Sequence, residues 1–427
     1  YFLLKMVESA DFSQVLLFLD SLGRFRIKPG LDRMRQGLDK LGRPDRDVFI
    51  IQVVGTNGKG SAACFLESLA REHGLLTGLY TSPHLISVRE RIMVAEKKVS
   101  RKIWAETAAE IASGCGNLNF SYFEFLTLMA VLIFRKMKVD LAVMEAGLGG
   151  SFDATSALDQ DFHVFTRVGL DHTRILGSTT EEIARDKAGA MSGSPAVIAR
   201  QEPVVMEIFR QRAAQVGTRL YSTRDWFVFE KDRLKQKDEP GAEIPLSCLG
   251  LAGPHQLDNA AAALLAWKKI LKSVQMEYDH KLCLAGLKKA FWPGRMQVIN
   301  TSPLIILDAA HNPQALLALK KALEISGIKP RTMIFSCLAD KEVADMAEII
   351  KGFRAQRIFV PALDAGERSC DPELLCRQLG PSACPALEFP EILARMKPEE
   401  GPVLVCGSLY LLGLVYARFP ERLCRQG

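Results

Sequence analysis

A glycine-rich turn between an apolar run and an amphipathic segment constrains the fold of this chain most strongly. Residues 49–54 are apolar except at Gln52, as in a buried strand, and apolar residues recur at helical spacing after Lys59. The turn between them reads Gly55-Thr56-Asn57-Gly58-Lys59-Gly60-Ser61. A strand, a glycine turn and a helix N-terminus form an anion site, because free backbone N–H groups and the helix dipole point at one spot. This order predicts a phosphate-binding loop in an α/β fold.

The spacing within this turn differs from that of the common phosphate-binding loop. The common loop has four residues between its first glycine and the Gly-Lys pair. In this chain only Thr56 and Asn57 intervene, and Gly60 separates Lys59 from Ser61. Lys59 can bring positive charge to the terminal phosphates of a nucleotide, and a nearby hydroxyl such as that of Ser61 can reach Mg²⁺. The alternative is a surface turn without a ligand, which the flanking strand and helix signals disfavour.

Length and composition bound the class of protein. A chain of 427 residues exceeds what one core usually supports, so two domains are expected. The net charge of +6 is too small to indicate nucleic acid, but it suits a site for polyanions. Ten cysteines without a C-x-x-C pair indicate buried thiols in the cytoplasm, with no zinc site. No run approaches the roughly 18 apolar residues that cross a membrane. The start lacks a signal-peptide layout and an initiator methionine, which leaves the native N-terminus open.

Strand and helix signals alternate through the first two thirds of the chain. Expected strands lie near residues 75–80, 139–145 and 163–168, and a long apolar helix is expected at 123–137. Such alternation predicts a mostly parallel sheet with helices on both faces. Each expected strand ends in a polar motif, and ligands of such sheets bind beyond the C-terminal strand ends. We therefore expect the polar motifs to form one site.

The last third of the chain predicts a second domain. Further strands are expected at residues 304–308, 332–337, 357–360 and 403–406, with helices between them. We place the boundary near residue 298, after the Pro-Gly turn at 293–294. Residues 1–298 then form an N-terminal mononucleotide-binding domain, and residues 299–427 form a smaller Rossmann-like α/β domain. The charged segment 229–245 is expected to be an exposed hairpin or loop insertion, with its charges in solvent.

A metal site is expected where three strands end. Glu145 ends an apolar run, where a carboxylate is costly unless it meets a cation. Taken singly, Glu145 can form a salt bridge, His172 can be a core histidine, and Ser82 can be a turn hydroxyl. Together they place a carboxylate, an imidazole and a hydroxyl beside a phosphate-binding loop. This combination favours a Mg²⁺ site next to nucleotide phosphates.

Other polar residues also lie near expected strand ends or on one helix face. Lys187 lies on a helix near the same sheet edge, where a solvated lysine is the default interpretation. Asp308 follows a strand, so it can accept hydrogen bonds from a ribose or cap the next helix. His311 lies three residues further on. The helix face carrying His255 and Asn259 can border a nucleotide base.

These motifs, taken together, resemble those of the folylpolyglutamate synthase/dihydrofolate synthase family, a branch of the Mur-type ATP-dependent amide ligases. The resemblance spans about residues 20–415, and the wall-building Mur ligases typically have threonine in place of Gly60. The motifs that carry it are residues 55–61, Ser82-Pro83-His84-Leu85, Phe123-Glu124, Glu145 with residues 147–150, Asp153-Ala154-Thr155, Asp171-His172, Lys187-Ala188-Gly189, His255-Gln256 with Asn259, Pro293-Gly294-Arg295, Asp308 with His311-Asn312-Pro313, and Gly407-Ser408-Leu409.

The resemblance implies an ATP-dependent ligase with ATP and Mg²⁺ held between an N-terminal ATPase domain and a C-terminal α/β domain. It implies that Ser82, in place of Ser61, binds Mg²⁺ with Glu145 and His172, and that Lys187 is carbamylated and supports a second ion. The catalytic residues implied are Lys59, Glu145, His172, Lys187 and Arg295. The nucleotide-binding residues implied are Thr56, Asn57, Gly58, Lys59, Gly60, Ser61, Asn259, Arg295, Asp308 and His311.

The resemblance also implies the substrates, which are L-glutamate and a pterin acid, either dihydropteroate or a tetrahydrofolate. ATP converts the carboxylate into an acyl phosphate, which the amine of glutamate then attacks. The family precedent is a monomer in the cytoplasm without nucleic-acid or membrane partners. Residues 26–29 are expected to border the pterin. The other substrate-binding residues implied are Ser121, Tyr122, Phe123, Glu124, Phe152, Asp153 and Ala154.

Four positions depart from the family pattern. Ser151 and Ser156 stand where arginine and asparagine are usual, which weakens the expected anion contacts there. Gln297 and Ala309 replace a common glutamate and glycine, as in members that also use dihydropteroate, so we expect a bifunctional enzyme. Two rival functions stay open. One is an amide ligase for a non-folate acid, and the other is a nucleotide-binding switch or transport ATPase, which the short loop disfavours.

Overall fold

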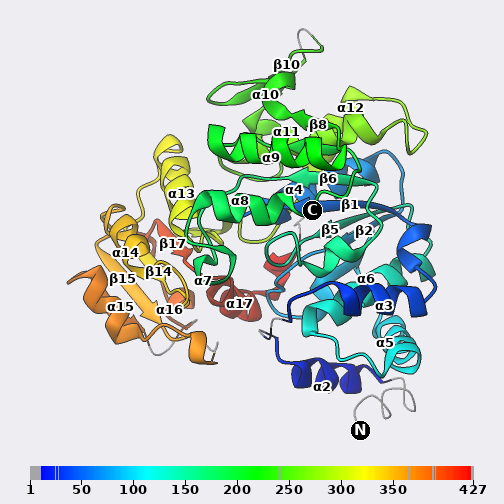
Figure 1. Ribbon diagram of the computed structural model, residues 1–427. Helices are drawn as coiled ribbons and strands as arrows, with labels where there is room; N and C mark the ends of the chain where they lie inside the picture. Colours follow the sequence, from blue (N-terminus) through cyan, green and yellow to red (C-terminus); the bar gives the residue numbers. More distant parts are fainter. Residues whose placement is uncertain are drawn as a thin grey trace.

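The computed structural model describes residues 11–424 except 25, 27, 240–241, 364–365, 387–388 and 390. The first residues of the chain and Ile27, within the segment expected to border the pterin, lie outside this range. Figure 1 shows two α/β regions, one built on a large sheet and one on a small sheet. We call them the large-sheet region, residues 11–289, and the small-sheet region, residues 297–418.

The large sheet has eight strands, and six neighbouring strands in it pair in parallel, as predicted. Its order is β4 (Lys97–Lys98), β3 (Ile92–Val94), β2 (Thr77–Tyr80), β5 (Leu141–Glu145), β1 (Phe49–Val54), β6 (Phe162–Phe165), β7 (Ala196–Ile198) and β8 (Leu220–Ser222). Strands β3 and β4 pair antiparallel at one edge. These two short strands carry no clear period-2 signal, and the sequence did not predict them.

Helices cover both faces of the large sheet (Figure 1). Ile51 and Val53 of β1 pack with the layer of α4, α11 and α12, whereas Ile50 packs with the layer of α3, α5 and α6. This division follows the alternation of side chains along a strand. The helices of this region are α2 (Phe12–Leu22), α3 (Asp32–Lys40), α4 (Lys59–Glu72), α5 (Arg101–Cys115), α6 (Tyr122–Lys136), α7 (Thr173–Leu176), α8 (Thr180–Ala188), α9 (Pro203–Val216), α10 (Thr223–Trp226), α11 (Gln256–Ile270) and α12 (His280–Lys289).

The charged segment 229–245 forms part of a small antiparallel sheet. Its strands are β9 (Phe227–Phe229), β10 (Arg233–Gln236) and β11 (Glu243–Pro245). The β10 hairpin projects from the top of the molecule in Figure 1, away from the small-sheet region. The hairpin interpretation of this segment is therefore correct.

The small sheet has six strands. Its order is β12 (Gln297–Thr301), β13 (Leu304–Leu307), β17 (Val403–Cys406), β14 (Thr332–Phe335), β15 (Arg357–Pro361) and β16 (Ala383–Ala386). All pairs are parallel except β12 with β13. The helices of this region are α13 (Pro313–Ile325), α14 (Val343–Lys351), α15 (Pro372–Leu379), α16 (Glu391–Ala394) and α17 (Leu409–Arg418). The position of a domain boundary near residue 298 stays a prediction, which limited proteolysis can test.

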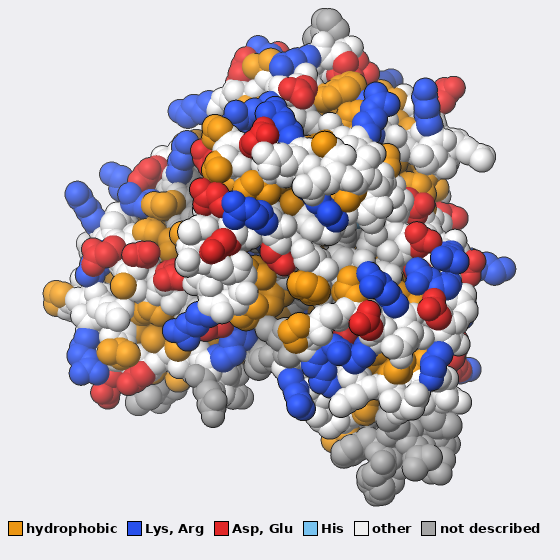
Figure 2. Space-filling view, in the orientation of Figure 1, with side chains coloured by type: hydrophobic (Ala, Val, Ile, Leu, Met, Phe, Trp, Pro, Cys, Tyr) orange, Lys and Arg blue, Asp and Glu red, His pale blue; other side chains and the backbone are white. Residues whose placement is uncertain are grey.

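The surface carries both signs of charge. Figure 2 shows Lys and Arg side chains interspersed with Asp and Glu over the face drawn. The net charge of +6 is thus not gathered into a single basic area on this face. Among the helices that the structure describes, none is long and apolar enough to cross a membrane.

Candidate active site

The glycine turn connects β1 to α4, as predicted. Close neighbours leave no room for a side chain at Gly58 or Gly60. Gly58 lies at the start of α4 in the left-handed region, with φ 88°. A Cβ atom at this position would lie 2.2 Å from Oδ1 of Asn259. A Cβ atom on Gly60 would lie 2.9 Å from Nε1 of Trp292. The glycine after Lys59, which distinguishes this loop, therefore leaves room for an indole.

Replacing Gly58 with alanine is expected to raise the KM for MgATP at least about tenfold. Alanine in the left-handed region costs about 1 kcal/mol, and its methyl group would displace the Asn259 amide. Steady-state ADP release at varied MgATP measures the change. Gly217→Ala is the matched control, because that helix-ending glycine is also left-handed but has open space around it. Equal KM values for the two variants would contradict a special role of Gly58.

Thr56 and Asn57 link the phosphate-binding loop to its surroundings. The Thr56 hydroxyl donates to the carbonyl of Gly169, in the loop after β6, at 3.0 Å. Nδ2 of Asn57 donates to Oε1 of Gln314 at 2.8 Å, and Oδ1 of Asn57 accepts from Nδ2 of Asn312 at 2.9 Å. Asn57 thus connects the loop to the small-sheet region. This contact could not be predicted from the sequence.

Glu145 lies at the C-terminal end of β5, directly beside the start of the Ser82 segment. Its side chain is 4% exposed, and Oε2 accepts the backbone N–H of Ser82 at 3.1 Å. Burial raises the pKa of Glu145, while the charges of Lys59, Arg295 and Arg91 and the Ser82 N–H oppose this rise. A carboxylate in this position favours a bound cation.

His172 lies where the loop after β6 enters α7, in the left-handed region at φ 52°. Burial, together with the charge of Lys341, lowers the pKa of His172 to about 4. The imidazole is therefore neutral at neutral pH and has a lone pair for a metal ion. Within the described part of the chain, no group of three or more His, Cys, Asp or Glu side chains is arranged so that it could hold a metal ion. The expected Mg²⁺ site of Ser82, Glu145 and His172 contains only two side chains of these types, so it is consistent with this observation. It also leaves coordination positions for phosphate oxygens.

Asp171 joins the two regions of the molecule through three residues of the small-sheet region. Oδ1 of Asp171 lies 2.5 Å from Nζ of Lys341, and both side chains are less than a tenth exposed. Oδ2 accepts from Nδ2 of Asn312 at 3.2 Å and lies 3.6 Å from Nε2 of His311. Burial alone would raise the pKa of Asp171, but His311, Lys341 and His172 outweigh it and hold the pKa well below its usual range. The aspartate is ionised and forms a buried salt bridge between the regions.

A double-mutant cycle on Asp171 and Lys341 is expected to give a coupling free energy of about 1–3 kcal/mol in unfolding. Each single change, Asp171→Asn or Lys341→Met, leaves a buried partner charge uncompensated, which is strongly destabilising. The double variant removes both charges, so it should be less destabilised than the sum of the two. Chemical denaturation measures all three variants. Additive effects would mean that the buried salt bridge does not form in solution.

Lys187 lies in the last turn of α8, with its backbone against Gly150. It is 4% exposed, and burial lowers the pKa of its amine to about 7, with a further decrease from the charge of Lys59. The default expectation of a solvated lysine is therefore wrong. A substantial fraction of the amine is neutral at neutral pH, and a neutral amine is a nucleophile.

Arg295 and Asn259 lie against the start of α4, as expected for nucleotide contacts. Nε of Arg295 lies 3.4 Å from the Ser61 hydroxyl, and Oδ1 of Asn259 lies against Gly58. Asn259 also donates to Oε1 of Gln256 at 2.9 Å, which fixes its amide. Both residues therefore lie within reach of a nucleotide bound at the loop.

Asp308 holds two backbone segments together. Its oxygens accept the N–H groups of Met296 at 2.9 Å and Ala310 at 2.8 Å. It does not cap α13, because the side chain at that helix start belongs to Asn312, which accepts the N–H of Ala315. The helix-cap alternative for Asp308 is thus wrong. A ribose contact stays a prediction.

Three residues expected to bind the pterin hydrogen-bond their own chain, and a pterin contact for each of them stays a prediction. Ser121 and Glu124 form the reciprocal capping box at the start of α6. Asp153 accepts four hydrogen bonds, from the N–H groups of Gly147 and Leu148 and from the N–H and hydroxyl of Thr155. A carboxylate has about four acceptor positions, so those of Asp153 are filled by this loop.

The remaining predicted pterin contacts offer ring surfaces and a small side chain. The Phe123 ring lies against Gly147 and is 5.5 Å from the ring of Tyr80. Tyr122 is 3% exposed and Ala154 is 5% exposed, whereas Phe152 is 66% exposed at the surface. An exposed aromatic ring beside the Gly147 loop is available for stacking.

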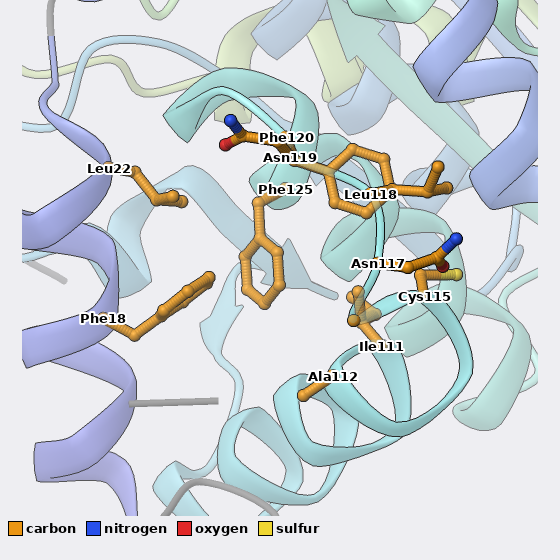
Figure 3. Close-up of a pocket in the computed structure, with 11 residues that line it drawn as sticks. Phe18, Leu22, Ile111, Ala112, Cys115, Asn117, Leu118, Asn119, Phe120 and Phe125 are labelled. Carbon is orange, nitrogen blue, oxygen red and sulfur yellow. The ribbon is translucent and has the colours of Figure 1, made fainter. Parts of the chain in front are cut away.

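A separate cavity of about 180 Å³ lies between α2, α5 and the segment before α6 (Figure 3). Figure 3 shows Phe18, Phe120 and Phe125 around it, with the amide of Asn119 at the top and that of Asn117 at the right. Its lining includes none of the residues predicted to bind substrate, nucleotide or metal. No charged side chain lines it, so it lacks the chemistry of the site described above.

Comparisons with known proteins agree with this geometry. Residues 53–267 match the Mur ligase middle domain, and residues 294–409 match the Mur ligase, glutamate ligase domain. A dihydrofolate synthase/folylpolyglutamate synthase from Bacillus subtilis is 30% identical, over 92% of this chain and 96% of the relative. The structure of E. coli FolC in complex with DHPP and ADP superposes with a TM-score of 0.85 at 30% identity, covering 97% of this chain and 99% of that chain.

A further solved structure is of a bifunctional folylpolyglutamate synthase/dihydrofolate synthase with Mn, AMPPNP and L-glutamate bound. It superposes with a TM-score of 0.83 at 30% identity, covering 96% of this chain and 98% of that chain. Both solved structures therefore match the small-sheet and large-sheet regions together, and not one region alone.

Proposed function

The chain belongs to the folylpolyglutamate synthase/dihydrofolate synthase family, and on this premise we propose that it joins L-glutamate to a pterin carboxylate. It is an ATP-dependent ligase that uses a divalent metal ion, in agreement with the ADP, AMPPNP and Mn of the related structures. One observation carries the proposal. The phosphate-binding loop, Glu145, His172 and Lys187 all lie at one sheet edge, where the Asp171–Lys341 pair holds the small-sheet region against it.

The chemistry follows from the charges at this edge. A carboxylate is a poor electrophile, so the γ-phosphoryl group of ATP is transferred to one of its oxygens, giving an acyl phosphate and ADP. The amine of glutamate attacks the acyl carbon, the tetrahedral intermediate collapses, and phosphate leaves with the amide formed. Lys59 and the N–H groups at the start of α4 hold the β- and γ-phosphates. Arg295, which lies beside Ser61, stabilises the charge that develops during the transfer.

The residues at the strand ends fit a magnesium ion. Glu145 supplies a buried carboxylate oxygen, His172 a neutral imidazole and Ser82 a hydroxyl, and Ser82 and Glu145 are already joined through the backbone. Such an ion, when bound, supplies positive charge to the phosphate oxygens. We assign Ser61 to the packing of the loop, because it is 1% exposed.

We propose that Lys187 carries a carbamate. Its amine is buried and partly neutral, and these are the conditions in which an amine adds to carbon dioxide. The amine nitrogen bonds to the carbon of CO₂ and releases a proton, so that a cation becomes an anion. The product is a carboxylate that supports a second magnesium ion.

Substrate contacts divide into ring surfaces and loop-shaping residues. Phe123 and Phe152 provide aromatic surface for the pterin acid, and the buried ring of Tyr122 lies behind them in the core. Ser121, Glu124 and Asp153 shape the segments that carry these rings, because their hydrogen bonds are made within the chain. Ala154 lines the same loop.

Ser151 and Ser156, the two positions in this loop that differ from the family pattern, have a structural explanation. The Ser156 hydroxyl donates to the carbonyl of Gly150 and accepts from Nε2 of Gln52, and the Ser151 hydroxyl donates to the carbonyl of Asp186. Ser151 thus ties the glycine loop to the segment that carries Lys187, and Ser156 ties it to β1. They replace charged or amide contacts by local hydrogen bonds.

We propose that both dihydropteroate and tetrahydrofolates are substrates. Gln297 gives this proposal little support, because its side chain accepts from the Gly294 N–H and the Tyr416 hydroxyl and donates to the carbonyl of Arg422. Gln297 therefore stabilises the Pro293-Gly294 turn, which precedes Arg295. The support that remains is Ala309 and the bifunctional relatives. We further propose a monomer in the cytoplasm, in keeping with ten free thiols.

The test is ADP release in the presence of MgATP, L-glutamate and a panel of acids. Dihydropteroate and tetrahydrofolate are each expected to give ADP release that also requires glutamate. Activity with tetrahydrofolate but not with dihydropteroate would assign the folylpolyglutamate synthase activity alone. Activity with a non-folate acid alone would assign a different amide ligase, and hydrolysis indifferent to glutamate would assign an ATPase.

A further inference from the structure

Arg91 is a buried cation without a carboxylate partner in the part of the chain that the structure describes. It is the last residue of the short helical turn Val88–Arg91, directly before β3, and is 8% exposed. The neighbouring carboxylate, Glu90, is occupied by the backbone N–H groups of Leu85, Ile86 and Ser87. None of the salt bridges among the described residues includes Arg91.

The contacts that Arg91 does make are neutral. Nε donates to Nδ1 of His84 at 2.9 Å, and the guanidinium carbon lies 5.3 Å from the centre of the Tyr122 ring. Because Nδ1 of His84 accepts this hydrogen bond, it carries a lone pair, and the imidazole is an uncharged acceptor. The two terminal nitrogens of the guanidinium make no hydrogen bond among the described residues.

An uncompensated buried cation is costly, and a protein retains one where a ligand supplies the opposite charge. The terminal nitrogens of an arginine form a planar fork that matches the two oxygens of a carboxylate. With Nε fixed on His84 and the plane resting near Tyr122, this fork is oriented in advance. The ligand it fits is a carboxylate.

The position of Arg91 indicates which carboxylate. The backbone carbonyl of Arg91 accepts the N–H of Thr81 at 3.0 Å, and the next residue, Ser82, donates its N–H to Glu145 at 3.1 Å. Gly413 of α17 also packs against the carbonyl of Leu85, within the same segment. Arg91 thus lies among the proposed metal ligands, the proposed pterin surface and the small-sheet region.

We propose that Arg91 binds the carboxylate of the pterin acid and holds it in line for the γ-phosphoryl group. Two anions must approach each other in this step, and a guanidinium on one of them lowers their repulsion. The inference rests on the proposed function, since it assigns a residue to the acid that this ligase activates. The acid is a benzoate-type carboxylate in dihydropteroate and a glutamate γ-carboxylate in tetrahydrofolates.

The test compares Arg91→Met with Arg91→Lys by steady-state ADP release. The Met variant is expected to raise the KM for dihydropteroate and tetrahydrofolate about 10- to 100-fold, since a charge-assisted hydrogen bond is lost, with the KM for MgATP and glutamate unchanged. The Lys variant keeps the charge but loses the fork, so its KM should lie between. Removing an unpaired buried charge should leave the Tm of the Met variant equal to or above that of the wild type. Arg89→Gln is the matched control, because Arg89 donates to the carbonyl of Val99 and should leave these KM values unchanged.

Three outcomes would overturn the proposal. These are an unchanged KM for the pterin acid, a raised KM for glutamate alone, and a lower Tm with a lower kcat at constant KM, which would mark a structural arginine. If the wild type itself shows no pterin-dependent ADP release, the proposed function fails, and this is seen before any variant is compared.

Discussion

Replacing Lys187 with alanine is expected to lower kcat by about 100-fold or more, and acetate or propionate is expected to restore part of the loss. The carbamate supplies a carboxylate at the end of a long side chain, and the truncation leaves a buried space in which a short acid can place the same group. Lys187 is 4% exposed and partly neutral, so both the modification and the rescue have a physical basis. ADP release at increasing acid concentration measures the rescue.

Two controls separate this result from a folding defect. Lys288→Ala removes an exposed lysine and should behave as wild type with or without added acid. Lys187→Met fills the space with an apolar side chain of similar length, so it should be inactive and resistant to rescue. Full activity of Lys187→Ala without any acid would remove the carbamate from the mechanism.

Replacing Glu145 with glutamine is expected to lower kcat by about 100-fold or more and to raise the Mg²⁺ concentration needed for half-maximal activity. Glutamine keeps the shape and can still accept the Ser82 N–H through its amide oxygen, but it has no charge for the ion. Burial raises the pKa of Glu145, so its charged form is costly in the absence of a metal. The Tm of the variant without Mg²⁺ should therefore equal or exceed that of the wild type.

Glu67→Gln provides the matched comparison. Glu67 is 3% exposed, and burial also raises its pKa, but its oxygens are held by Arg71 and the Thr77 hydroxyl. Its replacement should lower the Tm and leave the Mg²⁺ dependence unchanged. If the two variants respond alike to Mg²⁺, Glu145 is not a metal ligand.

The architecture could be predicted because most of its elements depend on local sequence patterns. Hydrophobic runs separated by glycine turns gave β1, β5 and β6 within a few residues, and the apolar segment expected at 123–137 is α6, Tyr122–Lys136. Short elements were missed, such as β3, β4 and β12, because two to five residues carry too weak a period. They pair with neighbours close in sequence, as in Thr301 with Leu304 and Val94 with Lys97, but no Asn-Gly or Asp-Gly pair marks these hairpin turns.

The strand-end residues were predictable for a topological reason, whereas the contacts between regions were not. Parallel strands deliver their C-terminal ends to one edge, so Glu145 and the Asp171-His172 pair had to lie near the phosphate-binding loop. Lys341 is 170 residues from Asp171, and a lone lysine in a polar loop gives no signal. Its position six residues after the end of β14, in the loop at the C-terminal edge of the small sheet, is the only hint the sequence offered.

Some residues were recognised by motif but have a different role in the structure. Asp153 and Gln297 use their hydrogen-bonding groups within the chain, so a motif can mark a residue that shapes a site without touching the ligand. Arg91 is the opposite case. An arginine beside a glutamate looks like an ordinary surface pair, and only its burial and the backbone contacts of Glu90 show that its charge is unpaired.

Transfer of oxygen from substrate to phosphate tests the central claim most directly. Dihydropteroate labelled with heavy oxygen in its carboxylate is incubated with MgATP and L-glutamate, and the inorganic phosphate released is examined by mass spectrometry. A carboxylate oxygen that attacks the γ-phosphorus leaves with that phosphate when glutamate displaces it, so each phosphate should carry one labelled oxygen. Amide formation that releases unlabelled phosphate would contradict an acyl phosphate, and with it the catalytic roles of Lys59, Glu145 and Lys187.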